Sequence, residues 1–211
     1  SNQFSVITGE TGAGKTTILR QFKELLEQKY GRSVIELRHR PSILPILSAV
    51  KHGKKKAEQK TLEALPRSGT NKSLISSLIR FSYYFLDYFF GQWVIYFKYS
   101  IKGNIIIYDR YYFDFINDAK RTNIRLNENF IKFFYRFVFK PDINIFLYAS
   151  PEIIISRKQE MDEKSIVELT DKYKILFDDF EAKYNQKYIS IENIDKYKTL
   201  NMIENIYTEL V

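Results

Sequence analysis

The chain alternates short apolar runs with longer stretches whose apolar residues recur at helical spacing. The apolar runs have the length of buried β-strands, and turn or charged residues bound them. They predict strands at 4–8, 33–37, 105–109, 142–148 and 188–191. Strands that alternate with helices form parallel sheets covered on both faces. The pattern therefore predicts an α/β three-layer sandwich with a five-stranded parallel sheet.

The most apolar helical stretch covers residues 74–100, and Ser73 before it is a typical N-cap residue. Aromatic residues lie on nearly all sides of this predicted helix. Polar residues interrupt it: Arg80, Asp87, Gln92 and Lys98. Because polar residues disfavour a membrane span, we expect either a buried helix or one shared with a second copy in a homodimer.

The segment 51–73 is polar and lysine-rich, contains glycine and proline, and has no apolar period. This composition predicts a mobile loop. Its lysine cluster at 54–56 is better explained as a solvated face than as a nucleic-acid patch. The chain shows no internal repeat, and its length predicts a single domain over 1–211.

The composition bears on the binding partners, the disulfides and the cell compartment to be expected. The net charge of +8 suits a protein that handles phosphates, and charge alone would also fit nucleic acid or an anionic membrane surface. The absence of cysteine excludes disulfides and fits the cytoplasm. His39 and His52 lie outside any metal-ligand pattern and predict no zinc site. The chain opens Ser1-Asn2-Gln3, which we interpret as a processed tag or an excised domain.

Residues 9–16 match the pattern G-x-x-x-x-G-K-[ST], placed between the first strand and the first helix, and we call this segment the phosphate loop. Glycines let the chain curl its backbone N–H groups around phosphate oxygens, and the helix N-terminus adds donors. Lys15 is expected to reach the β- and γ-phosphates, and the Thr16 hydroxyl to ligate Mg²⁺. The residues expected to bind the nucleotide are Gly9, Glu10, Thr11, Gly12, Ala13, Gly14, Lys15, Thr16 and Thr17.

Two other predicted strands end in charged residues. The apolar run 105–108 is followed by Asp109. A strand that ends in an acid is expected where a second side chain helps to hold Mg²⁺. The second strand leads into Arg38 and Arg40. Because ligands of open α/β sheets bind outside the carboxyl ends of the strands, these arginines are placed to meet substrate.

With Asp109-Arg110-Tyr111 added to the phosphate loop, the chain resembles the thymidylate kinase group of nucleoside monophosphate kinases over nearly its whole length. The resemblance implies a P-loop NTPase fold with a short helical lid at 151–165, and it implies ATP and Mg²⁺. It implies that Arg110 faces the phosphates that take part in the transfer. It also implies that Asp109 interacts either with the metal ion or with the acceptor.

The lid should supply cations that close over the equatorial oxygens, where phosphoryl transfer places charge. Arg157 and Lys158 are the candidates, because they lie on the helix after Ser150 and Pro151, where the family's lid helix begins. Lys164, just beyond, is better explained as a solvent-facing charge.

Several departures from the family concern the acceptor. Thr11 stands where thymidylate kinases usually carry an acid that reaches the acceptor sugar. Asp87-Tyr88 stands where they carry Asp-Arg, so the arginine that holds the acceptor's phosphate is lost. The glycines that follow their loop proline are missing after Pro41. The chain looks like a divergent bacterial branch labelled thymidylate kinase-like. The part of the site that binds the triphosphate is retained, and the part that binds thymidylate is altered.

A mononucleotide acceptor needs a fixed cation for its phosphate, preferably the fork of an arginine. The candidates are Arg38, Arg40, Arg80 and Arg121. Arg80 lies seven residues before Asp87, on the same helix face. The two residues either bind the acceptor or only form contacts with neighbouring residues at the edge of a core helix, and both interpretations stay open. With Asp87 and Tyr88, these arginines are the expected acceptor-binding residues.

We therefore expect an ATP- and Mg²⁺-dependent kinase that moves the γ-phosphate to a small acceptor, in first place a nucleoside monophosphate. A kinase for a nucleoside or sugar hydroxyl, with Asp87 or Asp109 accepting the proton, stays open. So does a switch or ATPase domain of a larger protein. Against that class, the chain has no Asn-Lys-x-Asp motif, and Arg110 rather than Glu follows Asp109. Nucleic acid and membrane are the less favoured partners, and nucleic-acid binding would depend steeply on salt.

Overall fold

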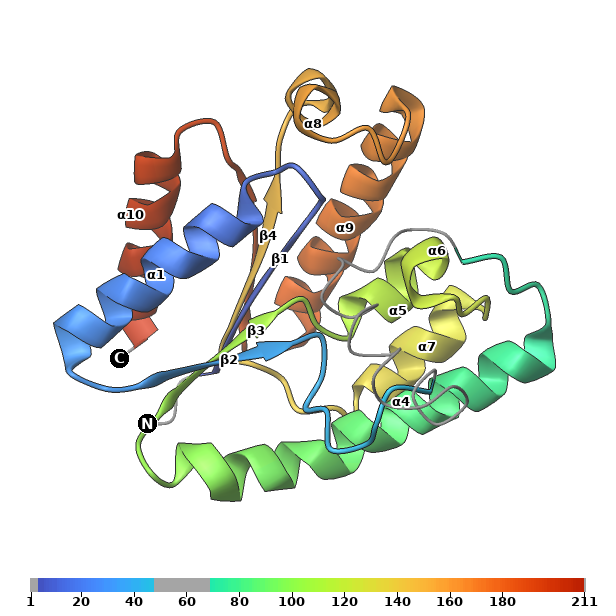
Figure 1. The fold of residues 1–211 in the computed structure, drawn as a ribbon, viewed down its shortest axis with the longest axis horizontal. Coiled ribbons are helices and arrows are strands. Elements are labelled where there is room, and N and C mark those ends of the chain that lie inside the picture. Colours follow the sequence, from blue (N-terminus) through green and yellow to red (C-terminus); the bar gives the residue numbers. More distant parts are fainter. Residues whose placement is uncertain (1–3, 48–68, 211) are drawn as a thin grey trace. The chain divides into compact units, whose positions relative to one another are not determined.

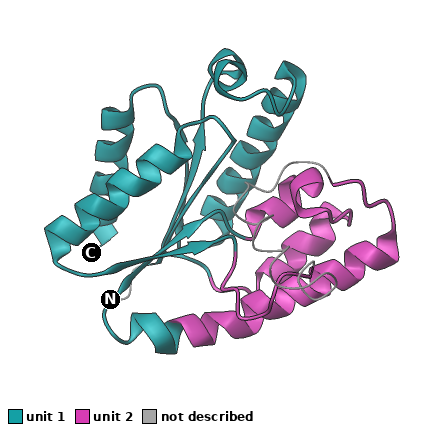
Figure 2. Cartoon of the chain, viewed as in Figure 1, with its two compact units in different colours: residues 1–39, 96–111, 140–211 teal, residues 40–95, 112–139 magenta. Residues whose placement is uncertain are grey.

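The computed structural model describes residues 4–47 and 69–210, and the chain divides into two compact units (Figure 2). Unit 1 comprises residues 1–39, 96–111 and 140–211, and unit 2 comprises residues 40–95 and 112–139. The predicted loop at 51–73 lies outside the described residues up to position 68. Its last part, 69–73, has no regular secondary structure.

The described residues of unit 1 form a five-stranded parallel sheet with the order β2-β3-β1-β4-β5. The strands are β1 (Phe4–Gly9), β2 (Val34–Arg38), β3 (Ile105–Asp109), β4 (Ile143–Tyr148) and β5 (Lys187–Glu192). Each lies at a predicted apolar run, so the predicted sheet is confirmed. β1 is central: Ile7 pairs with Asp109 on one side, and Gly9 pairs with Leu147 on the other. The carboxyl ends of β1 and β3 therefore meet at one edge.

One face of the sheet carries α1 (Lys15–Tyr30) and α10 (Lys196–Leu210), which pack side by side (Figure 1). Gly31 ends α1 in the left-handed conformation that glycine favours. Ile7 and Ile145 belong to one core cluster together with apolar residues of both helices. This core holds the end of β1 and the start of α1 in place.

The opposite face carries α9 (Glu163–Lys183) (Figure 1). Because successive side chains of a strand point to opposite faces, Phe146 points away from the first cluster. Its ring stacks on Tyr173 of α9, with the ring centroids 4.5 Å apart. Helices therefore cover both faces, and the predicted three-layer α/β sandwich is confirmed. The shorter α8 (Pro151–Arg157) precedes α9, with Ser150 at its N-cap as predicted.

Unit 2 is helical in its described residues. It contains α4 (Leu74–Ile95), α5 (Phe113–Asn117), α6 (Ala119–Thr122) and α7 (Glu128–Tyr135). Aromatic rings of α4, α5 and α7 meet around Phe81. Its neighbours, at centroid distances of 5.7 to 6.3 Å, are Tyr112, Phe115, Phe130 and Phe134. This aromatic cluster holds α5 and α7 against α4.

The helix predicted at 74–100 is confirmed, because α4 continues as a π-helical turn, η1, over Tyr96–Ser100. Ser73 caps the helix as predicted: its Oγ accepts a hydrogen bond from the backbone N of Ser76 at 3.3 Å. Side chains of the α4 face that packs in the aromatic cluster, such as Phe81 and Tyr88, are almost fully buried.

α4 carries a second apolar face, which is exposed. Its main members recur at helical spacing and expose 74%, 61%, 54% and 57% of their surface: Ile75, Ile79, Phe90 and Trp93. The charged residues of α4, Arg80 and Asp87, lie away from this face, half-buried and buried respectively. Within residues 4–47 and 69–210, no helix combines the length and the apolar character that crossing a bilayer requires.

Candidate functional site

The loop between β1 and α1 curls through two glycines. Gly12 has a φ of 96° and Gly14 a φ of 85°, in the left-handed region that other residues adopt only at a cost. The backbone N of Ala13 donates to the carbonyl of Glu10 at 3.1 Å, and α1 begins at Lys15. Within the described chain, no acceptor bonds to the N–H of Gly14. Backbone N–H groups arranged in this way form anion-binding concavities.

Gly9 is required for a different reason from the one that the sequence pattern suggested. Its φ lies outside the left-handed region, because Gly9 is the last residue of β1 and pairs with Leu147 of β4. A Cβ at this position would lie 2.6 Å from the carbonyl oxygen of Leu147. The close approach of β4, and not a turn, therefore excludes larger residues here.

Lys15 and Asp109 form a buried ion pair beside this loop. The Nζ of Lys15, at the start of α1, bonds to Oδ1 of Asp109, at the end of β3. Arg38 ends β2, and its Nε lies 3.6 Å from Oδ2 of Asp109. The three side chains meet because the strands that position them have their carboxyl ends at the same edge of the sheet.

Burial and neighbouring charges shift the pKa of both members of this pair. Burial lowers the pKa of Lys15, and the charge of Arg110 lowers it further, against the attraction of Asp109. Burial alone would raise the pKa of Asp109. The charges of Lys15 and Arg110 outweigh that effect, so the pKa of Asp109 lies below its ordinary value. Asp109 is therefore a carboxylate at neutral pH, surrounded by cations.

Arg110 follows Asp109 in the left-handed conformation, with a φ of 68°, and is almost fully buried. Such a backbone costs a non-glycine residue roughly 1 kcal/mol or more. Hydrogen bonds on both sides hold it: the N of Arg110 donates to the carbonyl of Ile7 at 3.1 Å, and the N of His39 donates to the carbonyl of Asp109 at 2.9 Å. Strained backbones of this kind cluster at functional sites.

The predicted lid cations differ in their contacts. Arg157, in the last turn of α8, donates from its guanidinium to the carbonyl oxygen of Gly12 at 3.0 Å. Lys158 is exposed, and its side chain makes no hydrogen bond or ion pair in the described chain. Lys164 is exposed and lies 3.9 Å from a carboxylate oxygen of Glu168. Of the three residues, Arg157 is the one that the structure brings to the phosphate loop.

Asp87, a predicted acceptor-binding residue, lies fully buried inside unit 2. Its Oδ2 accepts from a guanidinium nitrogen of Arg40 at 2.6 Å and from the backbone N of Ser42 at 3.0 Å. Its Oδ1 accepts from the backbone N of Leu44 at 2.8 Å. Arg40 also lies over the ring of Tyr84, 5.0 Å from its centroid. Asp87 and Arg40 thus bind each other, and together they fix the segment 40–44.

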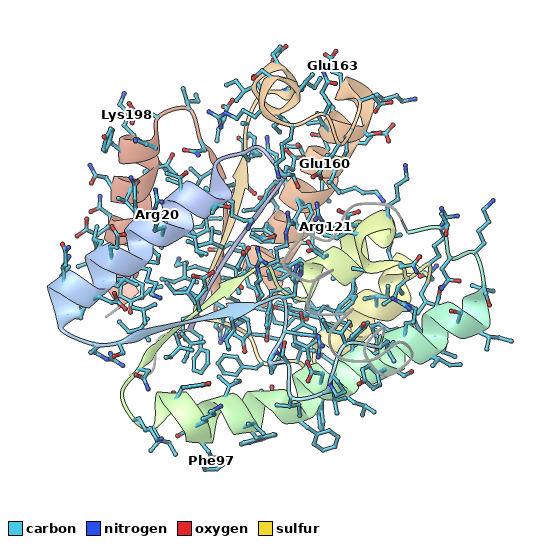
Figure 3. The ribbon with its side chains drawn as sticks, in the orientation of Figure 1. Arg20, Phe97, Arg121, Glu160, Glu163 and Lys198 are labelled. Atoms are coloured by element: carbon cyan, nitrogen blue, oxygen red, sulfur yellow. The ribbon has the colours of Figure 1, made fainter. Side chains whose placement is uncertain are left out.

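Two more acceptor candidates are buried within unit 2. Tyr88 exposes 1% of its surface and packs edge-on against Tyr112. Arg121, labelled in Figure 3, lies on α6, where its Nε donates to Asp118 Oδ2 at 3.3 Å. Arg80 is half-buried, and its Nε is buried without a hydrogen-bond partner in the described chain.

Sequence reasoning missed two residues that hold the phosphate loop. Asn193, after β5, donates from its side-chain nitrogen to the carbonyl of Ala13 at 2.8 Å. Thr170, on α9, donates from its hydroxyl to Glu10 Oε1. The one available signal was the position of Asn193 after a predicted strand, at the edge where ligands bind. No local pattern marks Thr170.

A magnesium ion fits the side chains beside the loop. In the described residues, no cluster of three or more His, Cys, Asp or Glu residues could hold a metal. Mg²⁺ keeps several waters and needs only one or two side chains besides substrate phosphates. Thr16, exposed in the first turn of α1, and Asp109 offer a hydroxyl and a carboxylate of this kind.

No protein-family model and no curated protein matches the sequence. Among solved structures, the chain is similar to the crystal structure of thymidylate kinase from Ehrlichia chaffeensis, with a TM-score of 0.62 and 16% identity. The similarity covers 99% of this chain and 99% of that chain. At such low identity, the likeness establishes the fold. The chain has the α/β nucleotide-kinase fold of a thymidylate kinase, as its resemblance in sequence implied.

Proposed function

We propose that the chain is a kinase that transfers the γ-phosphate of ATP to a small acceptor, with a nucleoside monophosphate as the first candidate. The observation that carries the proposal is the loop of Gly12 and Gly14 beside the Lys15–Asp109 pair, at the carboxyl edge of the sheet. Converging N–H groups, a lysine and a carboxylate suit a triphosphate and its metal ion. The fold supports this function.

The side chains of unit 1 can bind the donor and stabilise its charge. Phosphoryl transfer spreads negative charge over the equatorial oxygens, where fixed cations lower the barrier. Lys15 bonds to Asp109, Arg157 bonds to the loop, and the charge of Arg110 acts on both members of the Lys15–Asp109 pair. Thr16 and Asp109 would hold Mg²⁺, which would supply positive charge to neutralise the phosphates of the nucleotide. Asp109 also orients the ammonium of Lys15.

Arg80 is the residue that we assign to the acceptor's phosphate. Arg40 and Arg121 are already paired with Asp87 and Asp118. Arg80 forms no ion pair in the described chain, and its Nε is a buried donor without an acceptor there. A donor left in this state costs about 1–3 kcal/mol, which a bound phosphate oxygen would offset. The buried Nε of Arg80, which has no acceptor among the described residues, therefore favours an acceptor that carries a phosphate.

A hydroxyl acceptor would need a carboxylate that is free to take its proton. Asp87 accepts three hydrogen bonds within the core of unit 2. Asp109 is bonded to Lys15. Both carboxylates are occupied, and this favours a nucleoside monophosphate over a nucleoside or a sugar.

The test is ADP release from ATP and Mg²⁺ with a panel of acceptors: thymidylate, other nucleoside monophosphates, nucleosides and sugars. The proposal predicts that a mononucleotide raises ADP release well above the rate without acceptor. Stimulation by a nucleoside or a sugar alone would move the acceptor to a hydroxyl. Hydrolysis that no acceptor stimulates would identify an ATPase domain and contradict the proposal. Lys15→Met should abolish transfer while the circular dichroism spectrum stays unchanged.

We also propose that the exposed apolar face of α4 joins two copies of this chain. Large exposed apolar patches are rare on monomers and mark interaction sites. The face carries no charge, whereas the chain has a net charge of +8, so two copies meet there with least repulsion. A two-fold contact uses the same patch twice, and an uncharged helix face suits such self-pairing.

A further inference from the structure

Asn193 lies between β5 and α10 and connects three parts of unit 1. Its Nδ2 donates to the carbonyl of Ala13 at 2.8 Å, and its Oδ1 accepts from the hydroxyl of Thr199 at 2.9 Å. Its backbone N donates to the carbonyl of Tyr148, the last residue of β4, at 2.8 Å. Asn193 and Thr199 are 7% and 2% exposed. The hydroxyl on its oxygen and the loop carbonyl on its nitrogen hold the amide in one orientation.

This contact determines which way the peptide between Ala13 and Gly14 faces. In a trans peptide, the C=O and the N–H point in opposite directions. Asn193 holds the carbonyl of Ala13 on its own side, so the N–H of Gly14 points away from Asn193. A Cβ on residue 14 would lie 2.5 Å from Nδ2 of Asn193. The side chain of Asn193 thus lies directly behind the loop, and the N–H faces the other side.

We propose that Asn193 is a positioning residue of the donor site, which orients the N–H of Gly14 toward the phosphates, and that Thr199 holds the amide of Asn193 for this purpose. The inference rests on the proposed function, because it requires the loop to bind a nucleoside triphosphate. Asn193 acts through the Ala13–Gly14 peptide and touches no substrate. Donors that are oriented in advance bind better, because no reorganisation accompanies ligand binding.

Calorimetry with ADP and with a non-hydrolysable ATP analogue, each with Mg²⁺, measures donor affinity without an acceptor. Asn193→Ala removes the donor to the Ala13 carbonyl and should weaken affinity about tenfold. Thr199→Val removes the hydroxyl that orients the amide and should weaken affinity about threefold. Thr199→Ser keeps that hydroxyl and should retain wild-type affinity. A merely structural role would not separate the two Thr199 variants in this order.

Asp195→Ala is the matched control in the same loop. Asp195 accepts from the backbone N groups of Tyr197 and Lys198 at the start of α10, and in the described chain no hydrogen bond or ion pair joins its side chain to the phosphate loop. This variant should lower the melting temperature and leave donor affinity unchanged.

Wild-type affinity in folded Asn193→Ala would overturn the inference, and so would equal losses in Asn193→Ala and Asp195→Ala. If Asn193→Ala fails to fold, the Thr199 pair decides, and equal affinities in Thr199→Val and Thr199→Ser would overturn the inference. A wild-type chain that binds neither nucleotide would overturn the proposed function as well. All other failures concern Asn193 alone.

Discussion

The guanidinium of Arg157 donates a hydrogen bond to the carbonyl oxygen of Gly12, at 3.0 Å and across 145 positions of sequence. Arg157 ends α8, whereas Gly12 belongs to the phosphate loop after β1. The contact satisfies a loop carbonyl and brings a cation of the predicted lid to the loop. α8 is thereby linked to the residues that we expect to bind the triphosphate.

Arg157→Ala is expected to lower kcat/KM for ATP by roughly 100-fold, because it removes a cation from the transferring phosphate. Its melting temperature should stay the same, since the side chain is exposed. Lys158→Ala removes the neighbouring charge, which makes no such contact, and should change kcat/KM little. Steady-state ADP release compares them, and equal losses would show that Arg157 has no specific role.

Arg80→Gln is expected to raise the KM for a nucleoside monophosphate about tenfold, because the acceptor's phosphate loses a charged hydrogen-bond partner. Donor affinity, measured by calorimetry with ADP, should not change. Arg125→Gln removes the same charge from an exposed position of unit 2 and serves as the control. An unchanged KM in Arg80→Gln would assign the acceptor's phosphate to another residue.

Asp87→Asn is expected to lower the free energy of unfolding by about 3 kcal/mol, because it leaves the buried charge of Arg40 uncompensated. Urea unfolding at neutral pH provides the measurement. Glu168→Gln breaks the solvent-exposed pair with Lys164 and should have almost no effect. Losses of similar size in both variants would contradict a central role of Asp87 in unit 2.

The pKa of Asp109, lowered by Lys15 and Arg110 against the effect of burial, predicts a pH dependence of stability. The ordinary pKa of an aspartate is 3.8, and the pKa of Asp109 in the folded chain is lower. As the pH falls, the unfolded chain therefore binds this proton before the folded chain does. The stabilisation is complete above that value and is lost as the pH falls below it, through the folded pKa. Urea unfolding of wild type and Asp109→Asn should therefore differ less at about pH 3 than at about pH 6. A constant difference would argue against the lowered pKa.

Trp93→Asp is expected to convert a dimer into a monomer, because it places a charge in the exposed apolar face of α4. Sedimentation equilibrium measures the mass of each variant. Ile175→Asp introduces the same charge on α9, where the side chain is 67% exposed, and should leave the dimer intact. A monomeric wild-type chain at micromolar concentration would refute the proposed interface.

The elements that could be predicted are those whose signals are local. β3 begins and ends at the predicted residues, because its apolar run lies between the turn at Gly103 and the charged Arg110. The loop between β1 and α1 could be placed for the same reason, since its pattern occupies consecutive residues. The cap at Ser73 required nothing more than the residues beside it.

The contacts that escaped prediction join remote segments. Asn193 and Thr170 reach the loop only because parallel strands bring distant ends to one edge, and neither residue type marks this role. Arg40 and Asp87 were both selected as candidates, yet their spacing of 47 positions contains no sign that they bind each other. The burial of Tyr88 could not be predicted either, because it depends on how α5 packs against α4.

The bonds from Arg157, Thr170 and Asn193 to the phosphate loop span 145, 160 and 180 positions. Because synthesis runs from the N-terminus, residues 9–16 leave the ribosome before Arg157, Thr170 and Asn193 do. The loop therefore acquires its full support only after Asn193 has been made. Before that point the loop lacks contacts that hold it in the folded protein.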